Sequence, residues 1–134
     1  MTTPLTTPLT TSMTRQATPS RKQLGATKER QARAYLEQQG LQHLASNVRC
    51  KRGELDLVMR DGDSLVFIEV RFRASGRFGG AAASVDWRKQ ARLSAAAAHY
   101  LQRHPIALPC RFDVIAIDGA GTFTWIRHAF AAPA

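Results

Sequence analysis

The fold of this chain is decided by residues 53–73, which read GELDLVMRDGDSLVFIEVRFR. Alternating apolar and polar residues on both sides of Asp61-Gly62 predict two β-strands and a tight turn, because Asp-Gly favours the positive φ of hairpin turns. Side chains alternate between the two faces of a strand, so Glu69 shares a face with Phe67 and Arg71. A carboxylate therefore lies inside an apolar stretch, beside a cation.

The length of the hairpin loop decides whether Asp56 meets Glu69, because opposed residues of an antiparallel pair point to one face. A two-residue loop at 61–62 places Glu54 opposite Glu69, with Asp56 diagonally across. A four-residue loop at 61–64 places Asp56 opposite Glu69 itself, and a three-residue loop would separate them. Facing carboxylates repel each other, and a bound cation would offset that repulsion. Ligands that are all oxygen suit Mg²⁺ or Mn²⁺ rather than zinc.

The composition predicts one globular domain with a polyanionic partner. The chain has 134 residues, 44% of them hydrophobic, and a formal net charge of +9. Nucleic acid is the default partner of so basic a protein, although a basic surface that only maintains solubility is an equal alternative on charge alone. No apolar run is long enough to span a bilayer, and no signal peptide is visible. Cys50 and Cys110 lack metal-ligand spacing and are expected to be reduced thiols of a cytoplasmic protein.

The domain is expected to cover residues 21–130, with a disordered tail at 1–20 and a short tail at 131–134. The N-terminal stretch is rich in Thr, Ser and Pro, and the first acidic residue is Glu29. Such a composition cannot bury a core. The predicted elements are a helix at 21–39, a strand at 41–50, the two hairpin strands, a helix at 85–103 capped by Ser84, and strands at 110–117 and 122–128. This order, αβββαββ, predicts a mixed sheet flanked by helices, in which the second helix carries a parallel return.

Glu29 belongs to a stripe on the first helix that also contains Gly25, Ala32 and Leu36. This spacing places a carboxylate on the packing face of the helix. The alternative, favoured by spacing alone, is a boundary residue that reaches solvent or pairs with Arg33.

A set of short motifs recurs in a fixed order over about residues 24–130. They are Gly25-x-x-x-Glu29-x-x-Ala32, Gly53-Glu54-Leu55-Asp56-Leu57, Phe67-Ile68-Glu69-Val70-Arg71-Phe72-Arg73, Phe78-Gly79-Gly80-Ala81-Ala82-Ala83-Ser84-Val85, Lys89-Gln90 and Arg111-Phe112-Asp113-Val114. In this order and spacing the chain resembles the YraN family of small bacterial proteins, which belongs to the restriction-endonuclease-like, PD-(D/E)xK, superfamily. The resemblance implies an α/β fold and a nuclease-type site.

The superfamily pattern is an acidic residue, then Glu/Asp-x-Lys on the next strand, often with a glutamate on the first helix. The resemblance assigns Asp56 and Glu69 as ligands of Mg²⁺ or Mn²⁺, with the Val70 carbonyl as a third ligand and Glu29 as the helical acid. Arg71 stands where the superfamily has Lys. Because the pKa of Arg stays above about 12, Arg71 cannot act as a base, but it can orient water or stabilise developing charge. Its alternative role is an ion pair with Glu69.

Four cations near the predicted site are expected to contact phosphate: Arg73, Arg77, Arg88 and Lys89. Arg77 lies in a glycine-rich loop at 74–80, for which an ordinary flexible connection is the alternative. Lys89 is also a candidate to reach the site from the second helix. Without base-reading elements, structure-selective binding is expected, with DNA ahead of RNA. Homodimerisation, frequent in this fold, is left open.

Three functions compete. The first is a metal-dependent nuclease that hydrolyses phosphodiester bonds, the second a non-catalytic nucleic-acid-binding protein with the nuclease fold, and the third a scaffold for another protein. Asp113 is expected to have a structural role. Trp87 and Trp125 are expected at core or boundary positions, with stacking on bases as the alternative.

Overall fold

The computed structural model describes residues 20–73 and 85–131. The elements there are α1 (Arg21–Gln38), β1 (Gln42–Cys50), β2 (Gly53–Asp61), β3 (Ser64–Arg73), α3 (Trp87–Arg103), β4 (Cys110–Asp118) and β5 (Phe123–Phe130). This order confirms the predicted αβββαββ arrangement. Except for Ser20 and Ala131, the predicted tails lie outside the described residues, as do the glycine-rich loop with Arg77 and the predicted cap Ser84.

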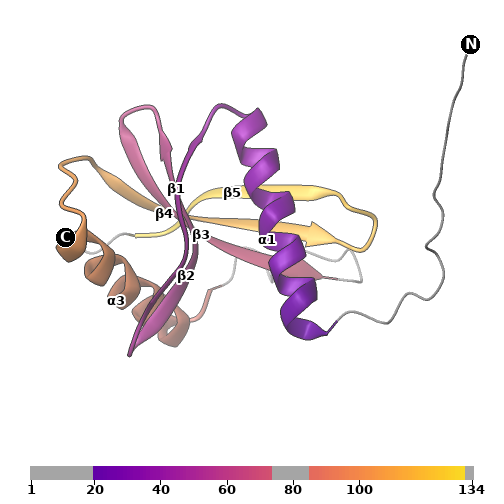
Figure 1. The fold of residues 1–134 in the computed structure, drawn as a ribbon, viewed down its shortest axis with the longest axis horizontal. Coiled ribbons are helices and arrows are strands. Elements are labelled where there is room, and N and C mark those ends of the chain that lie inside the picture. Colours follow the sequence, from indigo (N-terminus) through magenta and orange to yellow (C-terminus); the bar gives the residue numbers. More distant parts are fainter. Residues whose placement is uncertain (1–19, 74–84, 132–134) are drawn as a thin grey trace, which may run out of the picture.

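In the described residues, five strands form one sheet in the order β1-β2-β3-β4-β5. Neighbouring strands run antiparallel, except that β3 and β4 are parallel. A parallel pair needs a crossover connection, and α3 lies between these two strands in the chain. Figure 1 shows α1 and α3 as separate helices against the sheet. The predicted parallel return is confirmed.

Alternate residues of β3 supply two hydrophobic cores, one on each face of the sheet. Leu65 and Phe67 pack with Leu93 and other residues of α3. Val66 and Ile68 pack with the α1 side of the sheet, where Ala32 and Leu36 are fully buried. No helix in the described part of the chain combines the length and the apolarity needed to cross a membrane.

Both helices begin at capping side chains. At α1, Ser20 accepts the N–H of Gln23 and the Gln23 side chain accepts the N–H of Ser20, which forms a capping box. At α3 the cap is Asp86, whose carboxylate accepts the N–H of Lys89 at 2.9 Å. The predicted start at residue 85 with Ser84 as cap is therefore wrong. The reason is that Asp86 reaches the N–H three residues on and is at least as good a cap as serine.

The hairpin turns at Gly62-Asp63, and the last β2–β3 pair is Asp61 with Ser64. Gly62 has φ 59°, which suits the first central position of a type II′ turn. The two-residue loop at 61–62 is therefore wrong. The observed register is the one that the four-residue loop implied, with one additional pair before the turn.

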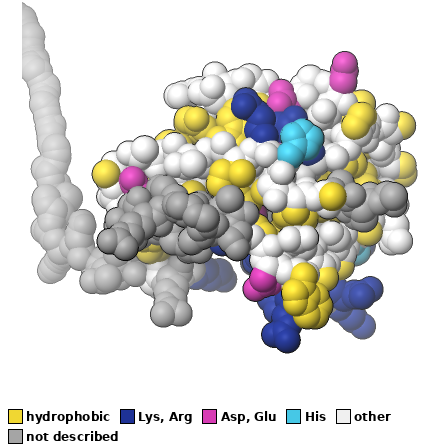
Figure 2. All heavy atoms as spheres, turned by 180° about the vertical axis from the view of Figure 1, so that it is seen from behind, with side chains coloured by type: hydrophobic (Ala, Val, Ile, Leu, Met, Phe, Trp, Pro, Cys, Tyr) yellow, Lys and Arg dark blue, Asp and Glu magenta, His cyan; other side chains and the backbone are white. Residues whose placement is uncertain are grey.

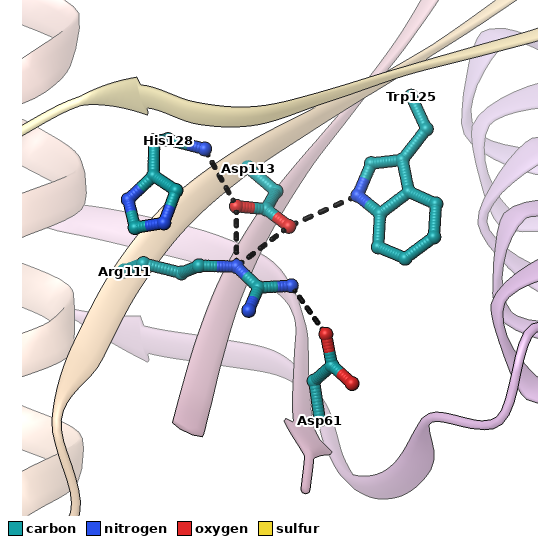
Figure 3. A network of polar contacts seen from close by, with 5 residues as sticks. All are labelled: Asp61, Arg111, Asp113, Trp125 and His128. Atoms are coloured by element: carbon teal, nitrogen blue, oxygen red, sulfur yellow. Dashed lines mark hydrogen bonds and ion pairs between the residues drawn. The ribbon is translucent and has the colours of Figure 1, made fainter. Parts of the chain in front are cut away.

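A buried polar network on β4 ties the far end of the hairpin to β5 (Figure 3). Asp113, 1% exposed, accepts from the Arg111 side chain at 3.1 Å, from Trp125 Nε1 at 2.9 Å and from the backbone N–H of His128 at 3.1 Å. Arg111 also pairs with Asp61 at 2.8 Å. The register between β4 and β5 shifts next to Asp113. The carboxylate of Asp113 therefore accepts the N–H of His128 in place of a backbone carbonyl. Asp113 thus has the structural role that was expected.

Candidate functional site

Asp56 and Glu69 meet where β2 leaves β3. The backbone ladder between these strands ends at the pair Leu57 and Ile68. The N–H of Val70 donates instead to Oδ2 of Asp56 at 2.8 Å, so a side chain takes the place of a backbone acceptor. The carboxyl groups of Asp56 and Glu69 interact directly and line one cavity. The structure therefore brings the two predicted metal ligands together.

This arrangement raises the pKa of Asp56 to about 8. Burial is the largest cause, because a carboxylate that loses its hydration is harder to ionise. The neighbouring charge of Glu69 raises the pKa further, and the Val70 N–H opposes the shift by stabilising the anion. At neutral pH most molecules therefore carry a protonated Asp56, and a cation at this position would favour the charged form.

Glu29 joins the pair from α1. It is half-buried, and burial raises its pKa, while hydrogen bonds with Asp56 and Asn47 act in the opposite direction. The alternative partner Arg33 pairs with Glu37 instead, at 3.3 Å. Glu29 therefore lies against Asp56, as the resemblance implied, rather than on the outer surface of the helix.

A cation from α3 forms an ion pair with Glu69. The ammonium of Lys89 lies 3.1 Å from Oε2 of Glu69, whose side chain is 10% exposed. Arg71 lines the same cavity from β3. Sequence reasoning led to two expectations for Lys89: that it contacts phosphate, and that it reaches the site from the second helix. The structure shows the second of these.

A close approach between two backbones positions α3 over this site. A Cβ atom at Gly53 would overlap the backbone carbonyl of Arg92. The start of β2 therefore packs directly on α3, one turn after Lys89. No side chain larger than hydrogen fits at Gly53 without moving the helix.

The carboxyl pair lies within a row of cations. One cavity of about 540 Å³ and a second of about 510 Å³ share Glu69, Lys89 and Arg92 in their walls, so they adjoin. We call these two cavities together the basic groove. Its other Lys and Arg side chains are Arg49, Lys51, Arg52, Arg71 and Arg88.

Sequence reasoning found only part of this groove. It missed Arg49, Lys51 and Arg52, and it did not assign Arg92 of the basic helix face to the site. Lys51 and Arg52 directly precede the Gly53-Glu54 motif, and this proximity was the available signal. The side chain of Arg73 and all of Arg77 lie outside the described residues.

The oxygen atoms at the site fit Mg²⁺ or Mn²⁺ in kind. In residues 20–73 and 85–131, no three His, Cys, Asp or Glu side chains form a group that could hold a metal ion. Mg²⁺ keeps several waters and needs few protein ligands, so Asp56 and Glu69 are a sufficient carboxylate pair. The N–H and C=O groups of one strand residue point to the same edge of that strand. The N–H of Val70 points toward Asp56, so the Val70 carbonyl points toward the carboxylate pair as well.

Comparison with known proteins gives consistent matches along most of the chain. Residues 28–117 match the profile described as "Uncharacterised protein family UPF0102". A UPF0102 protein of Xanthomonas oryzae pv. oryzae (strain PXO99A) is 56% identical over 116 residues, which cover 84% of this chain and 95% of the relative. A UPF0102 protein of Janthinobacterium sp. (strain Marseille) is 56% identical over 108 residues, covering 81% and 87%. One of Burkholderia lata is 54% identical over 112 residues, covering 83% and 78%.

Proposed function

The chain belongs to the uncharacterised protein family UPF0102, the YraN family expected from its motifs, and on that premise we propose that it is a metal-dependent nuclease. The reaction is hydrolysis of phosphodiester bonds in DNA or RNA. The observation that supports it best is the Asp56–Glu69 pair, with the raised pKa of Asp56, inside the basic groove.

In this proposal, Asp56, Glu69 and the Val70 carbonyl hold Mg²⁺ or Mn²⁺. A metal held there would supply polarisation of the phosphoryl oxygen and a lower pKa of the attacking water. Glu29, which touches Asp56, orients a water molecule by accepting its hydrogen bond. The cations on both sides of the pair bind the flanking phosphates.

Lys89 supplies the positive charge that the superfamily takes from the lysine of Glu-x-Lys. Its ammonium already lies at Glu69, on a flexible stem with three donors. Arg71 stays charged and stabilises the developing negative charge without acting as a base. Both side chains line the larger cavity, where a phosphate beside Glu69 would meet them.

The substrate is read through its shape. Cations that contact phosphate fix the position of a nucleic acid but carry no sequence information. The groove walls are rich in such cations, which supports structure-selective cleavage. DNA stays ahead of RNA as the expected substrate.

The test is a cleavage panel of linear, nicked, branched and single-stranded DNA and RNA with Mg²⁺ or Mn²⁺. We expect cleavage of at least one substrate by the wild type and its loss in Asp56→Asn and Glu69→Gln. Glu37→Gln is the matched control, because Glu37 is exposed on α1 and pairs only locally with Arg33. Equal cleavage by wild type and Asp56→Asn would exclude this site.

The second candidate is a nucleic-acid-binding protein without catalysis. The Lys89–Glu69 ion pair favours it, because an ammonium competes with a metal for the same carboxylate. In this case, Asp56→Asn and Glu69→Gln bind nucleic acid as tightly as the wild type or more tightly, and no member of the panel is cleaved.

A further inference from the structure

Trp87 projects from the surface at the first residue of α3. Its side chain is 71% exposed, so the expected core or boundary position is wrong. The other tryptophan, Trp125, is half-buried and bonds to Asp113. Burial of a large apolar side chain stabilises the folded state by about 1.5–3 kcal/mol, and an exposed indole does not contribute this free energy. The core does not use Trp87, and a contact with a ligand is a sufficient reason for its exposure.

The neighbours of Trp87 connect it with the basic groove. Asp86, Arg88 and Lys89 line the cavity of about 540 Å³ that also contains Glu69. The indole lines neither cavity, but it contacts Arg88, which does, and it lies two residues from the lysine that pairs with Glu69. Figure 2 shows hydrophobic atoms projecting between Lys and Arg side chains at the lower edge of the molecule.

Arg88 prepares one face of the indole. Its guanidinium lies 5.3 Å from the ring centroid, in cation–π contact. The large exposure leaves room for a second planar group on the other face. An aromatic ring beside cations that track a phosphate backbone is the arrangement by which proteins hold single-stranded nucleic acid.

We propose that Trp87 stacks on an unpaired nucleobase, so that the ligand of the groove is a nucleic acid with a single-stranded segment. This inference rests on the proposed function for the identity of the ligand and adds the substrate class. Bases inside a duplex are stacked on each other and offer only their edges in the grooves, so the interior of an intact duplex supplies no free face to the indole.

The experiment measures binding without catalysis. The full chain in EDTA is titrated with a thymidine oligonucleotide and with an abasic oligonucleotide of equal length, which has the same phosphates but no bases. Binding is followed by tryptophan fluorescence and by anisotropy of a labelled strand. We expect the thymidine strand to quench the fluorescence and to bind about 5- to 100-fold more tightly than the abasic strand.

Two variants assign the effect to this residue. Trp87→Ala should bind both strands equally, while Trp87→Phe should keep most of the preference because it keeps an aromatic face. Leu44→Ala is the control, since Leu44 is an exposed apolar residue of β1 and lines none of the groove. Equal affinity of the wild type for both strands, an unchanged preference in Trp87→Ala, or no binding at all would overturn the proposal. A retained preference without cleavage in Mg²⁺ would support stacking while excluding the nuclease.

Discussion

Replacing Asp56 by Asn should make the protein more stable at neutral pH. Asn keeps an oxygen that can accept the Val70 N–H, and the substitution removes the ability of residue 56 to ionise. The folded-state pKa of about 8 lies above the ordinary value of 3.8. Between these values the folded chain retains a proton that the unfolded chain releases, so wild-type stability falls as the pH rises through this window.

The magnitude follows from the width of that window. From pH 3.8 to pH 7 about three pH units are crossed, each worth about 1.4 kcal/mol, which gives at most about 4 kcal/mol. The variant should therefore exceed the wild type by up to this amount at pH 7. At pH 4 the folded wild type keeps Asp56 neutral and the unfolded chain ionises it only in part, so the difference between the two proteins should fall below about 1 kcal/mol.

The assay is urea unfolding followed by circular dichroism at pH 4, 5, 6, 7 and 8. Asp113→Asn is the matched control, because it changes the same atoms on a carboxylate that Arg111 and Trp125 hold. Breaking that buried ion pair should destabilise the protein by about 3–5 kcal/mol. Mg²⁺ should stabilise the wild type and leave Asp56→Asn unchanged. A stability difference between wild type and Asp56→Asn that does not vary with pH would refute this reasoning.

Changes at four further positions test the architecture around the site. Lys89→Met should slow single-turnover cleavage at least tenfold while Lys89→Arg retains more activity; an unaffected Met variant would remove Lys89 from the mechanism. Gly53→Ala should destabilise the fold by about 1–3 kcal/mol in thermal unfolding, because its Cβ meets the backbone of α3. The Cβ of Gly25→Ala meets no atom within 4 Å, so this change should stabilise α1 by up to about 1 kcal/mol. Equal effects of the two glycine changes would contradict the backbone contact between Gly53 and Arg92. The logarithm of nucleic-acid affinity should fall linearly with the logarithm of salt concentration, and Arg92→Ala should reduce the slope by about 0.7 on single-stranded DNA.

The pairing of Asp56 with Glu69 was predictable because it depends on short-range rules. Alternation along each strand and the turn signal after Asp61 fix which residues share a face. Two loop lengths stayed open from the sequence, and the four-residue one gave the observed register, since Asp61-Gly62 and Gly62-Asp63 both offer a glycine with positive φ. A pattern of residue types does not decide between two such neighbouring turns.

The contributions of α3 were harder to predict because they depend on how a helix packs across the sheet. The reach of Lys89 to Glu69 follows from the start of the helix at Asp86 and from the backbone contact at Gly53. Neither is encoded in the periodicity of the helix. The exposure of Trp87 is a further case, since aromatic residues are buried more often than not and only the packed structure shows that this one is not.

The carboxyl group of Asp56, which accepts the N–H of Val70 between β2 and β3, couples metal binding to the release of a proton. With Asp56 protonated, this site carries one negative charge fewer at neutral pH than the formal net charge of +9 assumes. Arrival of a divalent ion at Asp56 must therefore expel a proton into the buffer. The calorimetric heat of that event will vary with the ionisation enthalpy of the buffer, and the metal will add only one net charge to the protein.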